Sequence, residues 1–211
     1  MRTEDLIARL SADGARNPAI SVTSWRWMAA GAAMAAGLAL FATLGIRPDF
    51  MSALGSVWFV FKFVLSALVA VFALSAVRDL ASPTGSGRGM LRLAAPAVLL
   101  VLAVAFELSA TPSDRWVSLL SFSNGATCMV VVPLLGLVPL GLFLYASYER
   151  APVRPALQGA LCGLAAAGFA SFFYAARCTN DSPLFVATWY SLAALVLVAL
   201  GAVAGSKLLR W

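Results

Sequence analysis

Six stretches of about 20 mostly apolar residues recur along the chain, and this pattern constrains the fold more than any other feature. A helix of about 20 apolar residues is long enough to cross the hydrocarbon core of a bilayer. Only 11% of the residues are charged, against roughly 25% in soluble domains. The sequence therefore predicts an all-α membrane protein with a bundle of six transmembrane helices. The expected spans are residues 27–46, 54–77, 92–110, 126–147, 156–175 and 184–206.

The connections between the stretches are too short to form a second folded domain. We therefore divide the chain into an N-terminal segment, residues 1–24, and a transmembrane domain, residues 25–211. The first stretch is not typical of a signal peptide, because about 24 residues with mixed charges precede it.

Lysine and arginine are distributed unequally between the two sets of connections. With the N-terminus inside, eleven basic residues fall on the cytoplasmic side and Arg47, Arg115 and Arg177 fall outside, while Lys62 lies within a span. Cytoplasmic loops carry the excess of basic residues in membrane proteins. The distribution predicts that both termini are cytoplasmic and that residues 175–185 lie outside, in a bacterial periplasm.

The opening stretch "RTEDLIARLSAD" predicts a short amphipathic helix. Thr3 can cap its N-terminus, and Leu6, Ile7 and Leu10 share one face. A helix of about ten residues is marginal alone in water, so it needs a surface to lie against. Two alternatives are open: the helix rests on lipid headgroups or on the bundle, or it docks onto a cytoplasmic partner.

Several function classes are disfavoured by composition. The chain has no histidine, which excludes serine–histidine hydrolases, HExxH zinc proteases and haem proteins with histidine ligands. No nucleophile–base pair or carboxylate cluster indicates an enzyme, and no basic cluster with interleaved aromatics indicates direct nucleic-acid binding. Lys62 and Glu107 are charges within spans, which are costly and often functional. We expect them to pair or to reach the interface, and a small transporter or channel using both residues is the alternative.

The three cysteines differ in position. Cys162 lies deep in the fifth span and is expected to act as a small apolar residue. Cys128 and Cys178 lie at the outer ends of consecutive antiparallel spans, within plausible disulfide reach. Three interpretations stay open for this pair: a structural disulfide, a reversible thiol pair that senses oxidants, or capture of a soft metal ion.

The residues around Cys178 also have structural explanations. Asn180, Asp181 or Ser182 can cap the sixth helix, and Pro183 suits its first turn. Arg177 is expected to pair with Asp181 and to favour the thiolate of Cys178, because a nearby cation lowers the pKa of a thiol.

"ARCTNDSPLFVATWYSLA" resembles the last-loop signature of the NrsF family of bacterial membrane anti-sigma factors, named for negative regulation of sigma F. That signature reads close to His-Cys-Pro-Glu/Asp-Asp-Ser-Pro-x-Phe followed by Trp-Tyr. "CMVVVPLLGLVPLG", "RAPVRPALQGALCGLAAAG" and the N-terminal "TEDLIARLSAD" are similar to the family as well. The resemblance runs the length of the chain and is strongest from Cys128 to Tyr190.

The resemblance implies a non-enzymatic protein of the bacterial inner membrane. Such proteins hold an extracytoplasmic-function sigma factor through their cytoplasmic side and release it when metals or oxidants are perceived outside. It implies that Cys128 and Cys178 sense the signal, with a soft metal ion as a candidate ligand. It also implies that the sigma factor binds residues Leu6, Ile7, Arg9 and Leu10.

The chain departs from the signature at one informative position. Arg177 stands where the family has histidine, and Thr179-Asn180 replaces the usual Pro-Glu/Asp. Histidine can ligate a metal, whereas arginine stays protonated and cannot. The substitution favours thiol oxidation over metal coordination, with Arg177 and Asp181 as residues that tune the cysteine pair.

Overall fold

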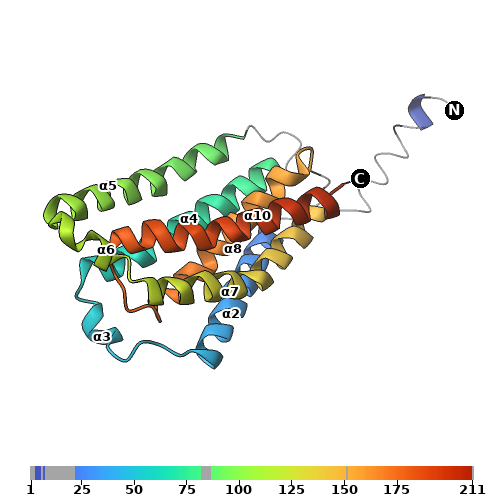
Figure 1. The fold of residues 1–211 in the computed structure, drawn as a ribbon. Coiled ribbons are helices and arrows are strands. Elements are labelled where there is room, and N and C mark those ends of the chain that lie inside the picture. Colours follow the sequence, from blue (N-terminus) through green and yellow to red (C-terminus); the bar gives the residue numbers. More distant parts are fainter. Residues whose placement is uncertain (1–2, 6, 8–21, 82–86, 151, 211) are drawn as a thin grey trace.

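The computed structural model describes the whole chain except residues 1–2, 6, 8–21, 82–86, 151 and 211. The described residues form helices and no strand. Figure 1 shows the long helices side by side, with the short helices α3 (Phe50–Ala53) and α6 (Trp116–Leu119) at one end of the bundle. We call this end the Cys178 end, and the other, where the last helix finishes, the Leu208 end.

Among the described residues, six helical segments are long and apolar enough to cross a membrane, as the sequence predicts. Their boundaries differ from the predicted ones by at most five residues. They are α2 (Val22–Thr43), α4 (Val57–Leu80), η1 (Arg88–Leu93) with α5 (Ala94–Ala110), α7 (Phe122–Tyr148), α8 (Pro155–Tyr174), and α9 (Pro183–Phe185) with the π-helical turn η3 (Val186–Tyr190) and α10 (Ser191–Leu208). The short 3-10 turn η2 (Ser113–Arg115) precedes α6.

Helix α8 occupies the centre of the bundle, where it packs against α2, α4, α7 and α10. Its sequence is rich in alanine and glycine, and small side chains let neighbouring helices approach closely. In an apolar stretch of 18 residues, 61% of the positions are buried in α8 but only 11% in the η1–α5 segment. Helix α5 accordingly lies along one edge in Figure 1.

Glycines at four-residue spacing in the last two spans, Gly159 with Gly163 and Gly201 with Gly205, lie at the contact between α8 and α10. A Cβ atom at Gly159 would overlap the carbonyl oxygen of Gly201, and one at Gly163 would overlap that of Leu197. Backbone of α8 therefore touches backbone of α10 without intervening side chains.

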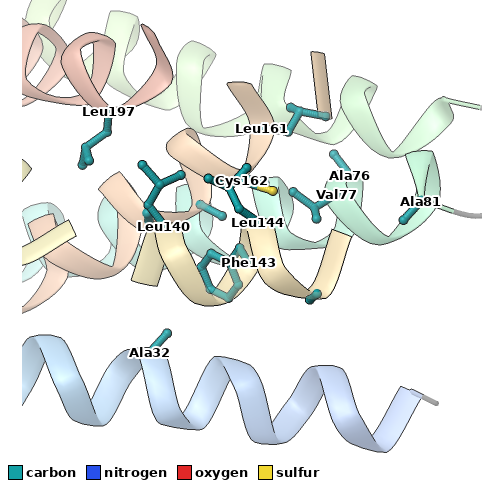
Figure 2. Packing of buried hydrophobic residues seen from close by; sticks show 14 of the residues in the cluster. Ala32, Ala76, Val77, Ala81, Leu140, Phe143, Leu144, Leu161, Cys162 and Leu197 are labelled. Atoms are coloured by element: carbon teal, nitrogen blue, oxygen red, sulfur yellow. The ribbon is translucent and has the colours of Figure 1, made fainter. Parts of the chain in front are cut away.

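Two buried clusters fill the bundle, one toward each end. Figure 2 shows the cluster toward the Leu208 end, where Leu140, Phe143 and Leu144 of α7 gather near Cys162 of α8. The second cluster lies toward the Cys178 end and contains both remaining cysteines. Each cluster joins residues from at least three helices, so the packing of one helix depends on its neighbours.

Candidate functional site: the loop around Cys178

Residues 175–182, which we call the Cys178 loop, connect α8 to α9. The amides of Arg177 and Cys178 donate to the Tyr174 carbonyl at 2.9 and 3.0 Å, so the loop begins as a tight turn. It ends at Ser182, whose hydroxyl accepts a hydrogen bond from the Phe185 amide. Ser182 is thus the predicted helix cap, and Pro183 occupies the first turn as expected.

Lys62 of α4 holds this loop from inside the bundle. Its side chain is fully buried, and its ammonium group donates to the Cys178 carbonyl at 2.7 Å and to an Asp181 carboxylate oxygen at 2.5 Å. The expectation that Lys62 pairs with Glu107 is wrong. Lys62 pairs with Asp181 because the face of α4 that carries Lys62 is turned toward the Cys178 loop.

Arg47 holds the same two groups from the connection between α2 and α4. Its guanidinium donates to both Asp181 oxygens at 3.1 Å and to the Cys178 carbonyl at 3.3 Å. Its own amide donates to the Ala176 carbonyl. The expected pairing of Asp181 with Arg177 is therefore wrong: two other cations take the carboxylate, and Arg177 is exposed.

Asp49 completes the charge balance of this group. Arg47 donates to its two carboxylate oxygens at 2.8 and 2.6 Å, and these hydrogen bonds lower the pKa of Asp49 to about 2. The same pair raises the pKa of Arg47 above its ordinary value. The charged groups of Arg47 and Lys62 both lie over the buried ring of Phe59, 5.2 and 4.9 Å from its centroid. Two cations and two carboxylates are thereby joined into a neutral cluster.

Glu107 of α5 contacts the far end of the loop. Its Oε2 atom accepts from the Ser182 hydroxyl at 2.9 Å and from the Leu184 amide at 2.8 Å. A carboxylate is favourable at a helix N-terminus, where free amides carry partial positive charge. Glu107 thus ties α5, which otherwise packs loosely, to the start of the last span.

The connection before α7 is fixed to the same region. The Asn180 amide donates to the Leu119 carbonyl at 3.1 Å, and the Trp189 indole donates to the Leu120 carbonyl at 2.7 Å. The Asn180 side chain also accepts from the Ser182 amide. Through Arg47, Lys62, Glu107 and these carbonyls, the Cys178 loop reaches four other parts of the chain.

Cys128 of α7 and Cys178 lie in one buried cluster with Tyr174, Phe185 and Tyr190. Both are free thiols in the structure, and the predicted disulfide reach stays a prediction. The Cys178 thiol donates to the Asn180 carbonyl at 3.6 Å. The Tyr190 hydroxyl is buried beside Cys178 without a hydrogen bond of ordinary geometry. No group of three or more His, Cys, Asp or Glu residues in the described part of the chain could hold a metal ion.

Cys162 belongs to a different polar group, toward the Leu208 end. Its sulfur lies 3.4 Å from the Ser147 hydroxyl, and Gln158 donates to Ser147 and to the Val77 carbonyl. All three side chains are buried. From the sequence we expected Cys162 to act as a simple apolar residue. In the structure it lies beside the hydrogen bonds of Gln158, which connect α4, α7 and α8.

Most of the predicted sigma-factor-binding residues fall in the part of the chain that the structure does not describe. Leu6, Arg9 and Leu10 lie outside the described residues, and Ile7 is helical and 61% exposed. Residues 3–5 are also helical, in agreement with the predicted helix. Sequence reasoning missed Arg47 as a site residue. The sequence "RPD" could have indicated it, because a basic residue stands two positions before an acidic one there. This loop also lies on the predicted outer side, where basic residues are few.

Comparisons with known proteins support the resemblance noted from the sequence. The family described as negative regulator of sigma F matches residues 10–211. The chain is 34% identical to the anti-sigma-F factor NrsF of Caulobacter vibrioides and 31% identical to the probable anti-sigma-F factor NrsF of Azospira oryzae. Each alignment spans the full length of both chains. No solved structure matches the chain. The chain belongs to the NrsF family of negative regulators of sigma F.

Proposed function

We propose that the protein is an inner-membrane anti-sigma factor that sequesters an extracytoplasmic-function sigma factor and releases it in response to a periplasmic metal or oxidant. Family membership supports negative regulation of a sigma factor, and it implies a regulatory rather than a catalytic role. The six apolar helices and the unequal distribution of basic residues support the membrane location and orientation. In this orientation the Cys178 end faces the periplasm.

One observation carries the signalling part of the proposal. The backbone at Cys178 is bound by Lys62 of α4, while the side chain of Cys178 shares a buried cluster with Cys128 of α7. A chemical change at the thiols therefore acts on a group that is attached to a third helix. A loop held only by its own local turns would not pass such a change to another helix.

The chemical step in the oxidant case is formation of a disulfide. One peroxide molecule takes two electrons and two protons from Cys128 and Cys178, leaving one sulfur–sulfur bond and two water molecules. A soft metal ion instead displaces the two thiol protons and bridges the sulfurs. A disulfide requires the two sulfurs to lie about 2 Å apart, and a metal bridge requires both to bind one ion, so either product would fix the position of the Cys178 loop relative to α7.

The movement is transmitted along α4. Displacing the Cys178 carbonyl weakens its hydrogen bond to Lys62, and α4 runs from that point to Leu80 at the opposite end. There the Gly89 amide of η1 donates to Asp79 of α4 at 3.1 Å. A change in α4 thus reaches the connection that we place in the cytoplasm. A tenfold loss of sigma-factor affinity requires only about 1.4 kcal/mol of coupling.

The sigma factor is proposed to bind residues 1–24, through Leu6, Ile7, Arg9 and Leu10. A short amphipathic helix that is marginal alone gains stability by laying its apolar face on a partner. The exposure of Ile7 is in keeping with this role.

Affinity capture of sigma factors from the native host tests the proposed partner. The full chain should recover one sigma factor, and a chain lacking residues 1–20 should recover none. The variant Ile7→Asp should reduce recovery because it places a charge on the docking face, whereas Asp5→Asn serves as the matched control. Recovery of no sigma factor by the full chain would contradict the function, and equal recovery by the truncated chain would contradict the docking site.

Replacing both Cys128 and Cys178 by serine tests the proposed sensor. Transcription from promoters of the released sigma factor should no longer rise after exposure to peroxide or cadmium, because neither a disulfide nor a thiolate bridge can form. Cys162→Ala is the matched control, since it removes a buried cysteine of the other cluster. An unchanged response in the double variant would exclude the cysteine pair as the sensor, while leaving sigma-factor binding intact as a separate result.

A further inference from the structure

We propose that the apolar cavity between α4, α5, α8 and α10 binds one acyl chain of an anionic membrane phospholipid. The cavity has a volume of about 370 Å³. Its walls include Leu65 and Val69 of α4, Leu100 of α5, Leu164 of α8 and Leu195 of α10. The inference rests on the proposed membrane location, but it does not depend on the identity of the cytoplasmic partner.

The cavity exists because small residues and a loosely packed helix meet at this place. Gly168 brings the backbone of α8 against that of Ala70 in α4, while Ala97 and Ala194 leave space on the α5 and α10 sides. Helix α5 is held mainly at its two ends, by Glu107 at the Cys178 end and by η1 at the other. Between these ends α5 contacts the bundle through few residues, among them Leu100 and Ala103, and the cavity lies beside them.

An acyl chain suits this space better than water or another helix. Thirteen of the 17 lining residues are apolar, and a buried water needs about two to four polar partners. A helix with its side chains is about 10–12 Å across, which is too wide for a cavity of this volume. Protein interiors leave few large voids, so the space is expected to be filled by the apolar chains that surround the bundle.

The charge at one mouth of the cavity favours an anionic headgroup. Leu93 lines the cavity, and the exposed Arg92 directly precedes it. Arg88 begins the same turn, and Arg78 directly precedes Asp79 in the last turn of α4, so these segments hold three arginines and one acid. Arginine binds phosphate through two parallel hydrogen bonds. In the proposed orientation this mouth faces the cytoplasmic leaflet, where anionic lipids attract basic segments.

The occupied cavity would touch the cysteine cluster. Val186 and Tyr190 line the cavity and also belong to the buried cluster that contains Cys128 and Cys178. The bound chain therefore packs against the same π-helical turn that follows the Cys178 loop. Filling the cavity is expected to support the packing of α5 and η3 against the bundle.

Photolabelling tests the proposal with the full chain in lipid nanodiscs. The probe is phosphatidylglycerol with a diazirine midway along one acyl chain, and labelled peptides are mapped by mass spectrometry. Labelling should concentrate on the lining residues of α4, α8 and α10. Ala194→Phe, which fills the cavity, should abolish this enrichment, while Leu192→Phe on the exposed face of the same helix should preserve it.

Two further comparisons keep the test decisive. Ala97→Phe fills the cavity from the loosely packed α5 side, so it serves if Ala194→Phe does not fold. A phosphatidylcholine probe with the same chain should label less than phosphatidylglycerol, and Arg92→Gln should remove the difference. Three results would overturn the proposal: uniform labelling of all lipid-facing residues, equal labelling by the two lipids, or crosslinks between two copies of the chain at this surface.

Discussion

At the scale of single residues, Lys62 shows how a buried charge can be used to attach one element to another. Its ammonium group is shielded from solvent and bonded to a carboxylate and to a backbone carbonyl of the same loop. Taking a charge out of water is costly, and the cost is offset only when opposite charge and hydrogen bonds surround it. Here the loop supplies both, so the position of the loop and the burial of Lys62 depend on each other.

Replacing Lys62 by methionine should lower the free energy of unfolding by about 2–3 kcal/mol, since it removes charged hydrogen bonds from a buried carbonyl and from Asp181. Arg47 continues to pair with Asp181 in this variant. The loss of stability is therefore smaller than it would be if the carboxylate had no cationic partner. Denaturant titration in detergent micelles measures the change. Arg177→Gln, an exposed cation of the same loop, should alter stability by less than about 0.5 kcal/mol. Equal effects of the two substitutions would show that Lys62 does not anchor the loop.

At the scale of elements, the sequence predicts the six spans well but not the partners of charges within them. A helix that crosses the hydrocarbon core of a bilayer must be long and apolar, so length and composition are sufficient to predict each span. Glu107 lies near the correct depth to meet Lys62, yet it bonds to Ser182 because α5 lies at the edge of the bundle. Which face of a helix turns toward which neighbour depends on packing among all six helices, and that information is not local in the sequence.

The contact between α8 and α10 is an element-scale feature that can be tested directly. Gly163→Ala should destabilise the bundle by about 1–3 kcal/mol, because the new methyl group would meet the backbone of Leu197. Gly141→Ala in α7 is the matched control. Nothing lies within 4 Å of a Cβ placed there, so the change should be neutral or stabilising by up to about 1 kcal/mol. Thermal unfolding in micelles compares the variants, and a tolerated Gly163→Ala would contradict backbone contact at this crossing.

At the scale of the whole molecule, the two ends of the bundle differ in chemistry. The Cys178 end carries the neutral cluster of Arg47, Lys62, Asp49 and Asp181, whereas most remaining basic residues gather in the connections of the Leu208 end. In the proposed function, the first end responds to thiol chemistry and the second forms the cytoplasmic surface. The helices between them provide the physical link over the thickness of a bilayer.

Accessibility of single cysteines checks this orientation. In a variant whose native cysteines are replaced by serine, Ser113→Cys should react with a membrane-impermeant maleimide in intact cells. Arg154→Cys should react only after lysis, because its connection is expected inside. Both positions are exposed in the structure, so reactivity reports the side of the membrane. The reverse pattern would place the N-terminal segment outside and exclude it from binding a cytoplasmic sigma factor.

The attachment of Lys62 to a carbonyl oxygen has an evolutionary consequence. Every amino acid carries that oxygen, so the hydrogen bond from Lys62 to position 178 does not depend on which side chain stands there. In the proposed mechanism, the thiol of Cys178 receives the signal, whereas its backbone carbonyl transmits the change to α4. Under that mechanism, a relative could carry another reactive or ligand-binding side chain at this position and keep the same hydrogen bond between the loop and α4.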